Sequence, residues 1–248
     1  MDEPKKKGFP RFVEIVFRDF WDLIRLNLLF CACMLPSAAL FAASLFGLLP
    51  YPALLLSLAA AFPAGGACCA CFFCITKMLR DDPGYLWHTF KRKFRENIKQ
   101  AMAPGVCYAT FLYAQIYLWA LFLFEGMPIG AGGAFLSLAS LLAFGMVVPY
   151  IFLLAAYIDL PMPEIVKNSL LLAFANAPRS FAGALSGGVI WLAFALLSPA
   201  SLTFSPFLFL FGFSMSWLAN LMWIWLPVDR QFAISETLKG VSDGSPLV

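Results

Sequence analysis

Charged side chains are scarce in this sequence. Only 12% of its 248 residues are Asp, Glu, Lys or Arg, whereas 62% are hydrophobic, and the mean hydropathy is +0.82. Soluble domains carry about 25% charged residues, because a surface in water has to be covered largely by polar groups. The shortage excludes a soluble globular protein, a disordered chain and a coiled coil. It leaves an integral membrane protein.

Groups that carry out catalysis are also scarce. The sequence has one histidine, His88, no Gly-rich phosphate loop with its lysine, and no charged residue near the middle of a long apolar stretch. Enzymes need groups that transfer protons, attack as nucleophiles or hold a metal, and proton-coupled pumps generally need an ionisable relay inside the membrane. We therefore expect a non-enzymatic protein without catalytic residues, resident metal or cofactor.

Four uncharged stretches predict the membrane spans: 26–76, 100–124, 126–158 and 180–228. A bilayer-crossing helix needs about 20 apolar residues, so the first and last stretches can each hold two spans joined by a proline-containing turn. Abundant Leu, Ala and Phe and few β-branched residues favour helices over a membrane β-barrel. The sequence therefore predicts an all-α polytopic bundle, one membrane domain over residues 1–248. Its six spans are expected at about 21–46, 51–78, 100–124, 134–158, 180–197 and 205–227.

The basic residues predict the orientation of these spans. In a six-span arrangement all 17 lysines and arginines fall on one side of the membrane, and the three opposite loops carry a single charge, Glu125. Basic residues concentrate in cytoplasmic loops of membrane proteins. We therefore expect a multi-pass protein with both termini in the cytoplasm.

Three segments between the spans combine an apolar face with a charged one: residues 9–25, 83–99 and 163–177. In the second, Asp82 is the expected N-cap and Pro83 the expected first residue of a helix. Such segments are typical of helices that lie in the membrane interface. We expect three cytoplasmic surface helices.

The second and third surface segments carry the candidate contact residues. Aromatic side chains there interleave with basic ones, a composition that suits anionic lipid headgroups, which attract each basic residue by about 1 kcal/mol, or a docked cytosolic protein. Nucleic acid is not an expected partner. The candidate residues for lipid or partner contact are Trp87, Phe90, Arg92, Phe94, Arg95 and Lys167.

Some polar and small residues within the spans are candidates for solute binding or for helix packing. Gln115 and Asn220 are either interhelical hydrogen-bonding groups or polar residues of a solute cavity. Glycines permit close approach of helices, within one molecule or between two. The candidate packing glycines are Gly65, Gly66, Gly183 and Gly187.

Seven cysteines lie in the cytoplasmic halves of the first three spans. Cysteine is a common small packing residue in apolar surroundings, and we expect that role here. A metal or redox site and acylation near the interface remain open alternatives. The cysteines are Cys31, Cys33, Cys68, Cys69, Cys71, Cys74 and Cys107.

Several short runs in this chain occur together in a known family of membrane proteins. They are Phe20-Trp21-Asp22-Leu23, Leu26-Asn27-Leu28-Leu29-Phe30, Leu35-Pro36, Pro63-Ala64, Arg80-Asp81-Asp82, Trp87-His88-Thr89-Phe90, Phe94-Arg95-Glu96-Asn97, and Lys167-Asn168-Ser169 with Asn176 and Arg179. In this combination the chain resembles the YesL-like family of bacterial integral membrane proteins of unknown function.

The resemblance implies a bacterial cell-membrane protein. Family members are often encoded beside genes for carbohydrate uptake and polysaccharide degradation, which implies a supporting role in sugar import. It implies no catalytic residues. Our leading expectation is a non-enzymatic accessory or regulatory membrane subunit supporting carbohydrate import, in contact with a permease or ATPase subunit of an ABC importer. The alternative is a stand-alone sugar transporter or permease. A membrane enzyme would require the cysteines to bind a metal.

Overall fold

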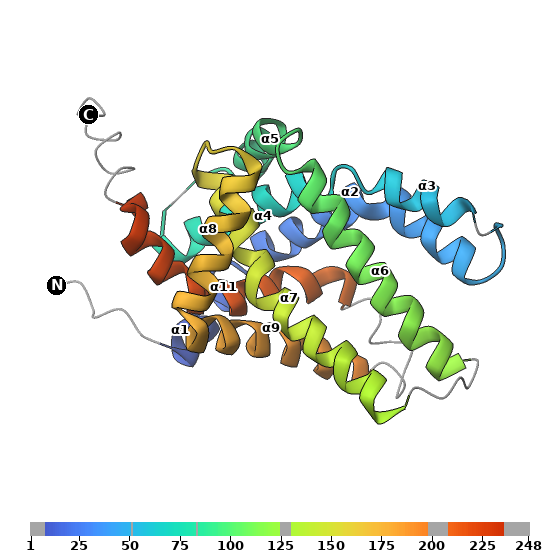
Figure 1. The fold of residues 1–248 in the computed structure, drawn as a ribbon. Helices are drawn as coiled ribbons and strands as arrows, with labels where there is room; N and C mark the ends of the chain where they lie inside the picture. The colour runs from blue at the N-terminus through green and yellow to red at the C-terminus, as the bar shows by residue number, and fades with distance from the viewer. Residues whose placement is uncertain (1–7, 51, 83, 125–129, 198–207, 236–248) are drawn as a thin grey trace.

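The computed structural model describes residues 8–50, 52–82, 84–124, 130–197 and 208–235, and every element in these ranges is a helix (Figure 1). The described part of the chain therefore confirms the all-α class. The elements in chain order are α1 (Phe9–Arg18), α2 (Phe20–Leu45), α3 (Pro52–Ala60), α4 (Ala64–Arg80), α5 (Leu86–Asn97), α6 (Met102–Phe124), α7 (Ala131–Tyr157), α8 (Met162–Ala175), α9 (Ala177–Leu197), the π-helix η3 (Leu208–Gly212) and α11 (Phe213–Phe232).

Among the described residues, four helical segments are long and apolar enough to cross a membrane: Phe20–Leu45, Pro52–Arg80, Met102–Phe122 and Ala131–Tyr157. They coincide with the first four spans that the sequence predicts. Helices of this length and composition suggest a membrane protein. The predicted fifth and sixth spans overlap α9 and η3 with α11, while the turn expected between them lies outside the described residues.

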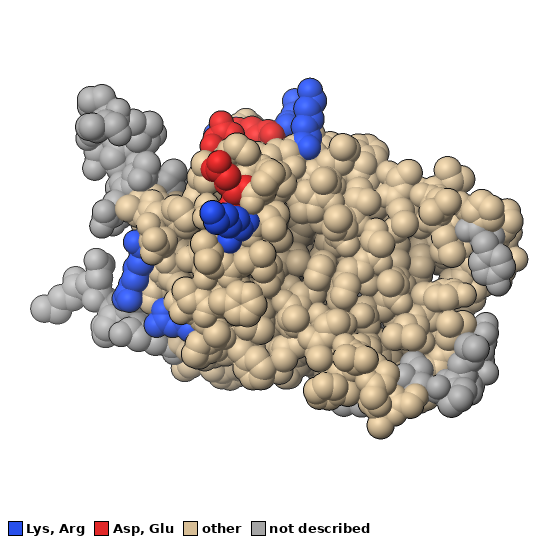
Figure 2. All heavy atoms as spheres, viewed as in Figure 1, with Lys and Arg blue, Asp and Glu red and all other residues tan. Residues whose placement is uncertain are grey.

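The long helices run back and forth between two ends of the molecule. Charged side chains gather at the end where α1, α5 and α8 lie, and the rest of the face seen in Figure 2 is uncharged. At that end α8 lies across the direction of α9 (Figure 1), and α1 contacts the end of α11. Glu125, the one charge predicted on the other side, lies outside the described residues.

The core forms around α4, which packs against α2, α5, α6, α7 and α11. Its Phe72 is 1% exposed, and its ring centroid lies 5.4 Å from that of Trp217 on α11. Phe30 of α2 meets the same indole edge-on at 4.7 Å. Aromatic contacts of this kind bury much area and fix ring geometry, so they hold α2, α4 and α11 together.

Two predicted boundaries need correction. The segment 9–25 is not one helix, because the chain breaks at Asp19 (φ −106°, ψ 24°) and residues 20–25 belong to α2. The second surface helix begins at Leu86, with Tyr85 at its N-cap position and no side-chain cap. Asp82 does not cap it, because its carboxylate lies 3.5 Å from both the Lys77 amine and the Arg80 guanidinium.

The predicted span 51–78 is divided at residues 61–63 into α3 and α4. Pro63 stands immediately before α4. Proline lacks an N–H and its ring disfavours a continuous helix through the preceding turn, so it accounts for the break. The predicted span 51–78 is therefore not one continuous helix.

Candidate functional site

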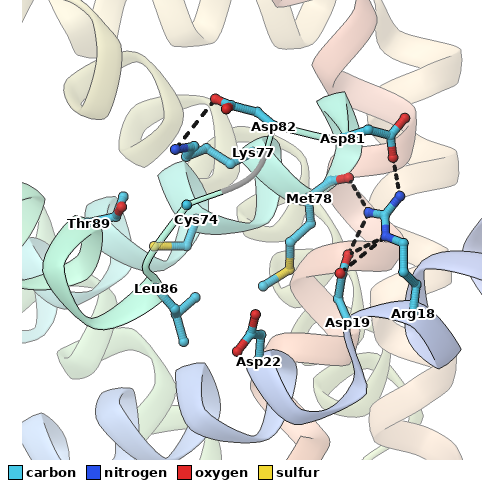
Figure 3. A pocket seen from close by; sticks show the side chains of 11 residues that line it. Arg18, Asp19, Asp22, Cys74, Lys77, Met78, Asp81, Asp82, Leu86 and Thr89 are labelled. Carbon is cyan, nitrogen blue, oxygen red and sulfur yellow. Dashed lines mark hydrogen bonds and ion pairs between the residues drawn. The ribbon is translucent and has the colours of Figure 1, made fainter.

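A pocket of about 370 Å³ opens at the charged end of the molecule (Figure 3). It lies where the start of α2, the end of α4 and the start of α5 converge. Its lining combines carboxylates, two basic side chains and an apolar floor. The lining residues are Arg18, Asp19, Asp22, Cys74, Lys77, Met78, Asp81, Asp82, Gly84, Leu86 and Thr89.

One side of the pocket is a tight ionic clasp between α1 and the end of α4. Asp81 accepts hydrogen bonds from Arg11, at 2.6 Å, and from Arg18. Arg18 also donates to Asp19 at 2.6 Å and to the Met78 carbonyl at 2.8 Å. Because Met78 is on α4 and Asp81 directly follows that helix, the clasp fixes α1 across the end of α4.

The backbone explains how Asp81 reaches both arginines. It is the C-cap residue of α4 and has a left-handed conformation, with φ 60° and ψ 34°. Asp tolerates this conformation better than most residues because of its short polar side chain. Hydrogen bonding to Asp19, followed by that to Asp81, raises the pKa of Arg18 above its ordinary value, so this guanidinium stays charged.

Surface helix α5 is held on α4 by its aromatic residues. Phe90 is 4% exposed and stacks on the half-buried Phe94 at 6.1 Å, while the Lys93 amine lies 4.7 Å from the centre of the Phe73 ring. The prediction of Phe90 as a contact residue is therefore wrong, because its side chain is buried in the packing of α5 on α4. Trp87 is 60% exposed.

The accessible part of the predicted contact face is smaller and more polar than expected. Arg95 and Lys167 are exposed, and the Arg92 side chain is 55% exposed although it lies 3.8 Å from Glu96. We call these exposed members of the predicted contact set, together with Trp87, the platform face: Trp87, Arg92 and Arg95 on α5 and Lys167 on α8. Sequence periodicity placed Phe90 and Trp87 on one stripe, and only the packing of α5 on α4 separates them.

The predicted packing glycines all meet other parts of the same chain. Gly65 and Gly66 lie against the segment that joins α5 to α6, and Gly183 and Gly187 lie against Asn220 and Ser216 of α11. Gly105 of α6, which the sequence did not single out, faces the backbone of Gly65. The described glycine contacts therefore match packing within one molecule.

The two predicted cavity residues differ in their environments. Gln115 is hydrogen bonded at both ends of its amide to α7: its Nε2 donates to Ser140 at 3.0 Å and its Oε1 accepts from Ser137. Asn220 is 6% exposed and donates to the Gly145 carbonyl at 3.4 Å. Its Oδ1 has no hydrogen-bond partner among the described residues.

The cysteines of α4 are packed in the core, where each is at most 2% exposed. Cys107 of α6 is exposed and lies apart from them in the chain. Among the described residues, no group of three His, Cys, Asp or Glu side chains could hold a metal ion. The burial of the four α4 cysteines matches the expected packing role, whereas the exposed Cys107 does not.

Asn27 of α2 supports the start of α11. It is fully buried, and its Oδ1 accepts a hydrogen bond at 3.0 Å from the backbone N–H of Ser214, the second residue of α11. Helix starts leave N–H groups without intrahelical partners, and such groups are unfavourable in an apolar environment. Asn27 thus satisfies a donor that α11 itself cannot.

We expect Asn27→Leu to lower the free energy of unfolding by about 1 kcal/mol, the upper part of the range for interhelical hydrogen bonds in membranes. Thermal unfolding in detergent would measure this. Thr110→Val is the matched control, because the Thr110 hydroxyl donates only to the Val106 carbonyl of its own helix, at 2.8 Å. Equal midpoints for the two variants would contradict the supporting role.

In the part of the chain that the structure describes, the fold and the charge distribution define an all-helical protein with four candidate membrane spans and a charged end that carries a pocket. No protein-family model, curated protein or solved structure matches it.

Proposed function

We propose that the chain is a multi-pass protein of the bacterial cell membrane, with six spans and both termini in the cytoplasm. The four candidate spans supply the first part of this arrangement, with α9 and η3–α11 as the fifth and sixth. The charged end then faces the cytoplasm, in line with the preference of basic residues for that side. On this placement α1, α5 and α8 are amphipathic helices at the cytoplasmic interface.

We further propose that the protein is a non-enzymatic accessory or regulatory subunit for carbohydrate import, which contacts a permease or ATPase subunit through the platform face. The observation that carries this proposal is the exposure of Trp87, Arg92, Arg95 and Lys167 on helices held firmly by buried partners. Exposed aromatic and arginine side chains on a rigid support are typical of protein interfaces. The resemblance to the YesL-like family supplies the link to carbohydrates.

The rival proposal is a stand-alone transporter of small solutes, and one observation favours it. The buried Asn220 Oδ1 has no partner among the described residues, and an orphaned acceptor inside a span is what a bound solute would use. Against it, the Gln115 amide is hydrogen bonded at both of its ends to α7. Flux of a panel of sugars into liposomes that contain only this protein would decide for the transporter.

Charge reversal on the platform face should release the importer. We expect the triple variant Arg92→Glu, Arg95→Glu, Lys167→Glu to reduce co-purification of importer subunits about tenfold, because like charges set against each other disfavour an interface by more than 1 kcal/mol. Sugar uptake in a deletion strain should recover with the wild-type chain but not with the variant. Arg230→Glu, an exposed basic residue at the end of α11, is the matched control. Absence of importer subunits in the wild-type preparation, with normal uptake in the deletion strain, would refute the proposal.

A further inference from the structure

The pocket at the charged end has a loose half beside the clasp. Lys77 lies 3.5 Å from Asp82, beyond the usual range of an N–H···O hydrogen bond. Asp22 is 39% exposed and pairs at 3.2 Å with Arg25, whose side chain is 69% exposed. These groups are therefore held much less firmly than Asp81 and Arg18, and they are open to a ligand.

The two loose charges lie on opposite sides of an apolar floor. Figure 3 shows the Lys77 side chain on one side of the pocket and the Asp22 carboxylate on the other, with Cys74 and Met78 between them. Cys74 is 2% and Met78 8% exposed, so the floor of the pocket is closely packed. A ligand that fits such a pocket carries an anionic and a cationic group a short distance apart.

The level of the pocket in the proposed membrane placement favours a lipid as that ligand. Helix α2 has 26 residues and is thus about 39 Å long, longer than the hydrocarbon core of about 30 Å. Asp22 is in its first turn, and Lys77 is in the last turn of α4. On the membrane placement proposed above, on which this inference rests, both reach the level of the headgroups.

The neighbouring surface of α2 offers a path for an acyl chain. Trp21, Leu28 and Leu35 recur every seven residues and are 68%, 46% and 66% exposed. Residues seven apart lie on one face of a helix. An apolar stripe therefore leads from beside Asp22 along α2.

We propose that this pocket binds the headgroup of phosphatidylethanolamine. Its ammonium group, with three N–H donors, would bind the Asp22 carboxylate, and its phosphate would bind the Lys77 amine. Phosphatidylcholine presents no N–H to Asp22. Phosphatidylglycerol has no cationic group, so its phosphate would lie near the four pocket carboxylates without an ammonium group to bind Asp22.

Lipid retention in the purified protein tests the assignment. We would place the full chain in nanodiscs that contain phosphatidylcholine and phosphatidylethanolamine with the same acyl chains, and count retained lipids by native mass spectrometry. We expect an about tenfold preference for phosphatidylethanolamine, the size of a charge-assisted hydrogen bond. The preference should fall stepwise through the N-methyl and N,N-dimethyl lipids. This series uses only the wild-type chain, so it stays decisive if a variant fails to fold.

Variants separate the two ends of the headgroup. Asp22→Asn should abolish the preference over phosphatidylcholine while Asp22→Glu keeps it, and Lys77→Gln should weaken retention of both lipids. Glu164→Gln and Lys91→Gln, both exposed at the same end, are the matched controls and should behave as wild type.

Three results would overturn the assignment: no preference in the wild type, an unchanged preference in a folded Asp22→Asn variant, or a preference for phosphatidylglycerol. Displacement of the lipid by an equal concentration of soluble glycerophosphoethanolamine would also overturn it, in favour of a free headgroup compound. No importer is present in this experiment, so its failure is distinguishable from failure of the proposed accessory function.

Discussion

Gly65→Ala and Gly105→Ala should each prevent α4 and α6 from packing as they do in the native fold. A Cβ atom built at Gly65 would lie 1.7 Å from the Ala101 carbonyl oxygen, and one at Gly105 would lie 2.1 Å from the Gly65 backbone nitrogen. Both obstacles are backbone atoms, so no side-chain rotation can relieve the overlap. Overpacking a core costs about 1–3 kcal/mol even where side chains can adjust. We expect at least about 3 kcal/mol here.

The measurement is the free energy of unfolding in detergent, followed by helix content and size-exclusion profile. Gly188→Ala is the matched control, because it also lies within a helix but has no atom within 4 Å of its built Cβ. We expect this control to be neutral or slightly more stable, since alanine favours helix. A Gly65→Ala variant as stable as Gly188→Ala would show that α4 and α6 do not approach this closely.

The difference between Gly65 and Gly105 shows where sequence reasoning stops. Gly65 and Gly66 were predictable as packing residues because they stand in a run of small residues after Pro63. Gly105 stands midway between Ala101 and Ala109, a small-xxx-small spacing that indicates close helix approach but does not identify the partner. Close approach depends on both partners, and the partner of Gly105 lies 40 residues earlier in the chain.

The helical class and the four candidate spans were predictable because they follow from composition and length, which act along the chain. The break at Asp19 and the late start of α5 were not. At both places an aspartate that could cap the following helix forms ion pairs instead. Asp19 binds Arg18, and Asp82 lies near Lys77 and Arg80. Helix propensity is a weak guide when neighbouring basic side chains compete for the capping group.

The pocket was the least predictable feature. The run Arg80-Asp81-Asp82 was visible as a distinctive motif, but its two carboxylates act differently. Asp81 turns to arginines 63 and 70 residues away, while Asp82 stays near basic groups of its own helix end. The left-handed backbone conformation of Asp81 directs its carboxylate away from that of Asp82. Two adjacent aspartates in a sequence do not indicate that their side chains point to different partners.

Loss of the Asp81 charge should release α1 from the bundle. Asp81→Asn keeps a residue that tolerates φ 60°, so it removes the charge without straining the backbone. The Arg11 side chain is 11% exposed and would lose a carboxylate at 2.6 Å. Breaking a buried ion pair costs about 3–5 kcal/mol. Because Asp81 is 28% and Arg18 38% exposed, solvent screening reduces our expectation to about 2 kcal/mol.

Hydrogen exchange measures this release directly, because it reports local opening separately from global unfolding. We expect amide protection in α1 to fall about 30-fold, the equivalent of 2 kcal/mol, with protection in α4 unchanged. Asp82→Asn is the matched control: its carboxylate is 44% exposed and lies 3.5 Å from its basic partners, so its loss should leave α1 protected. If both variants leave α1 equally protected, α1 is held by its apolar face, through the fully buried Ile15, and the clasp serves only to shape the wall of the pocket.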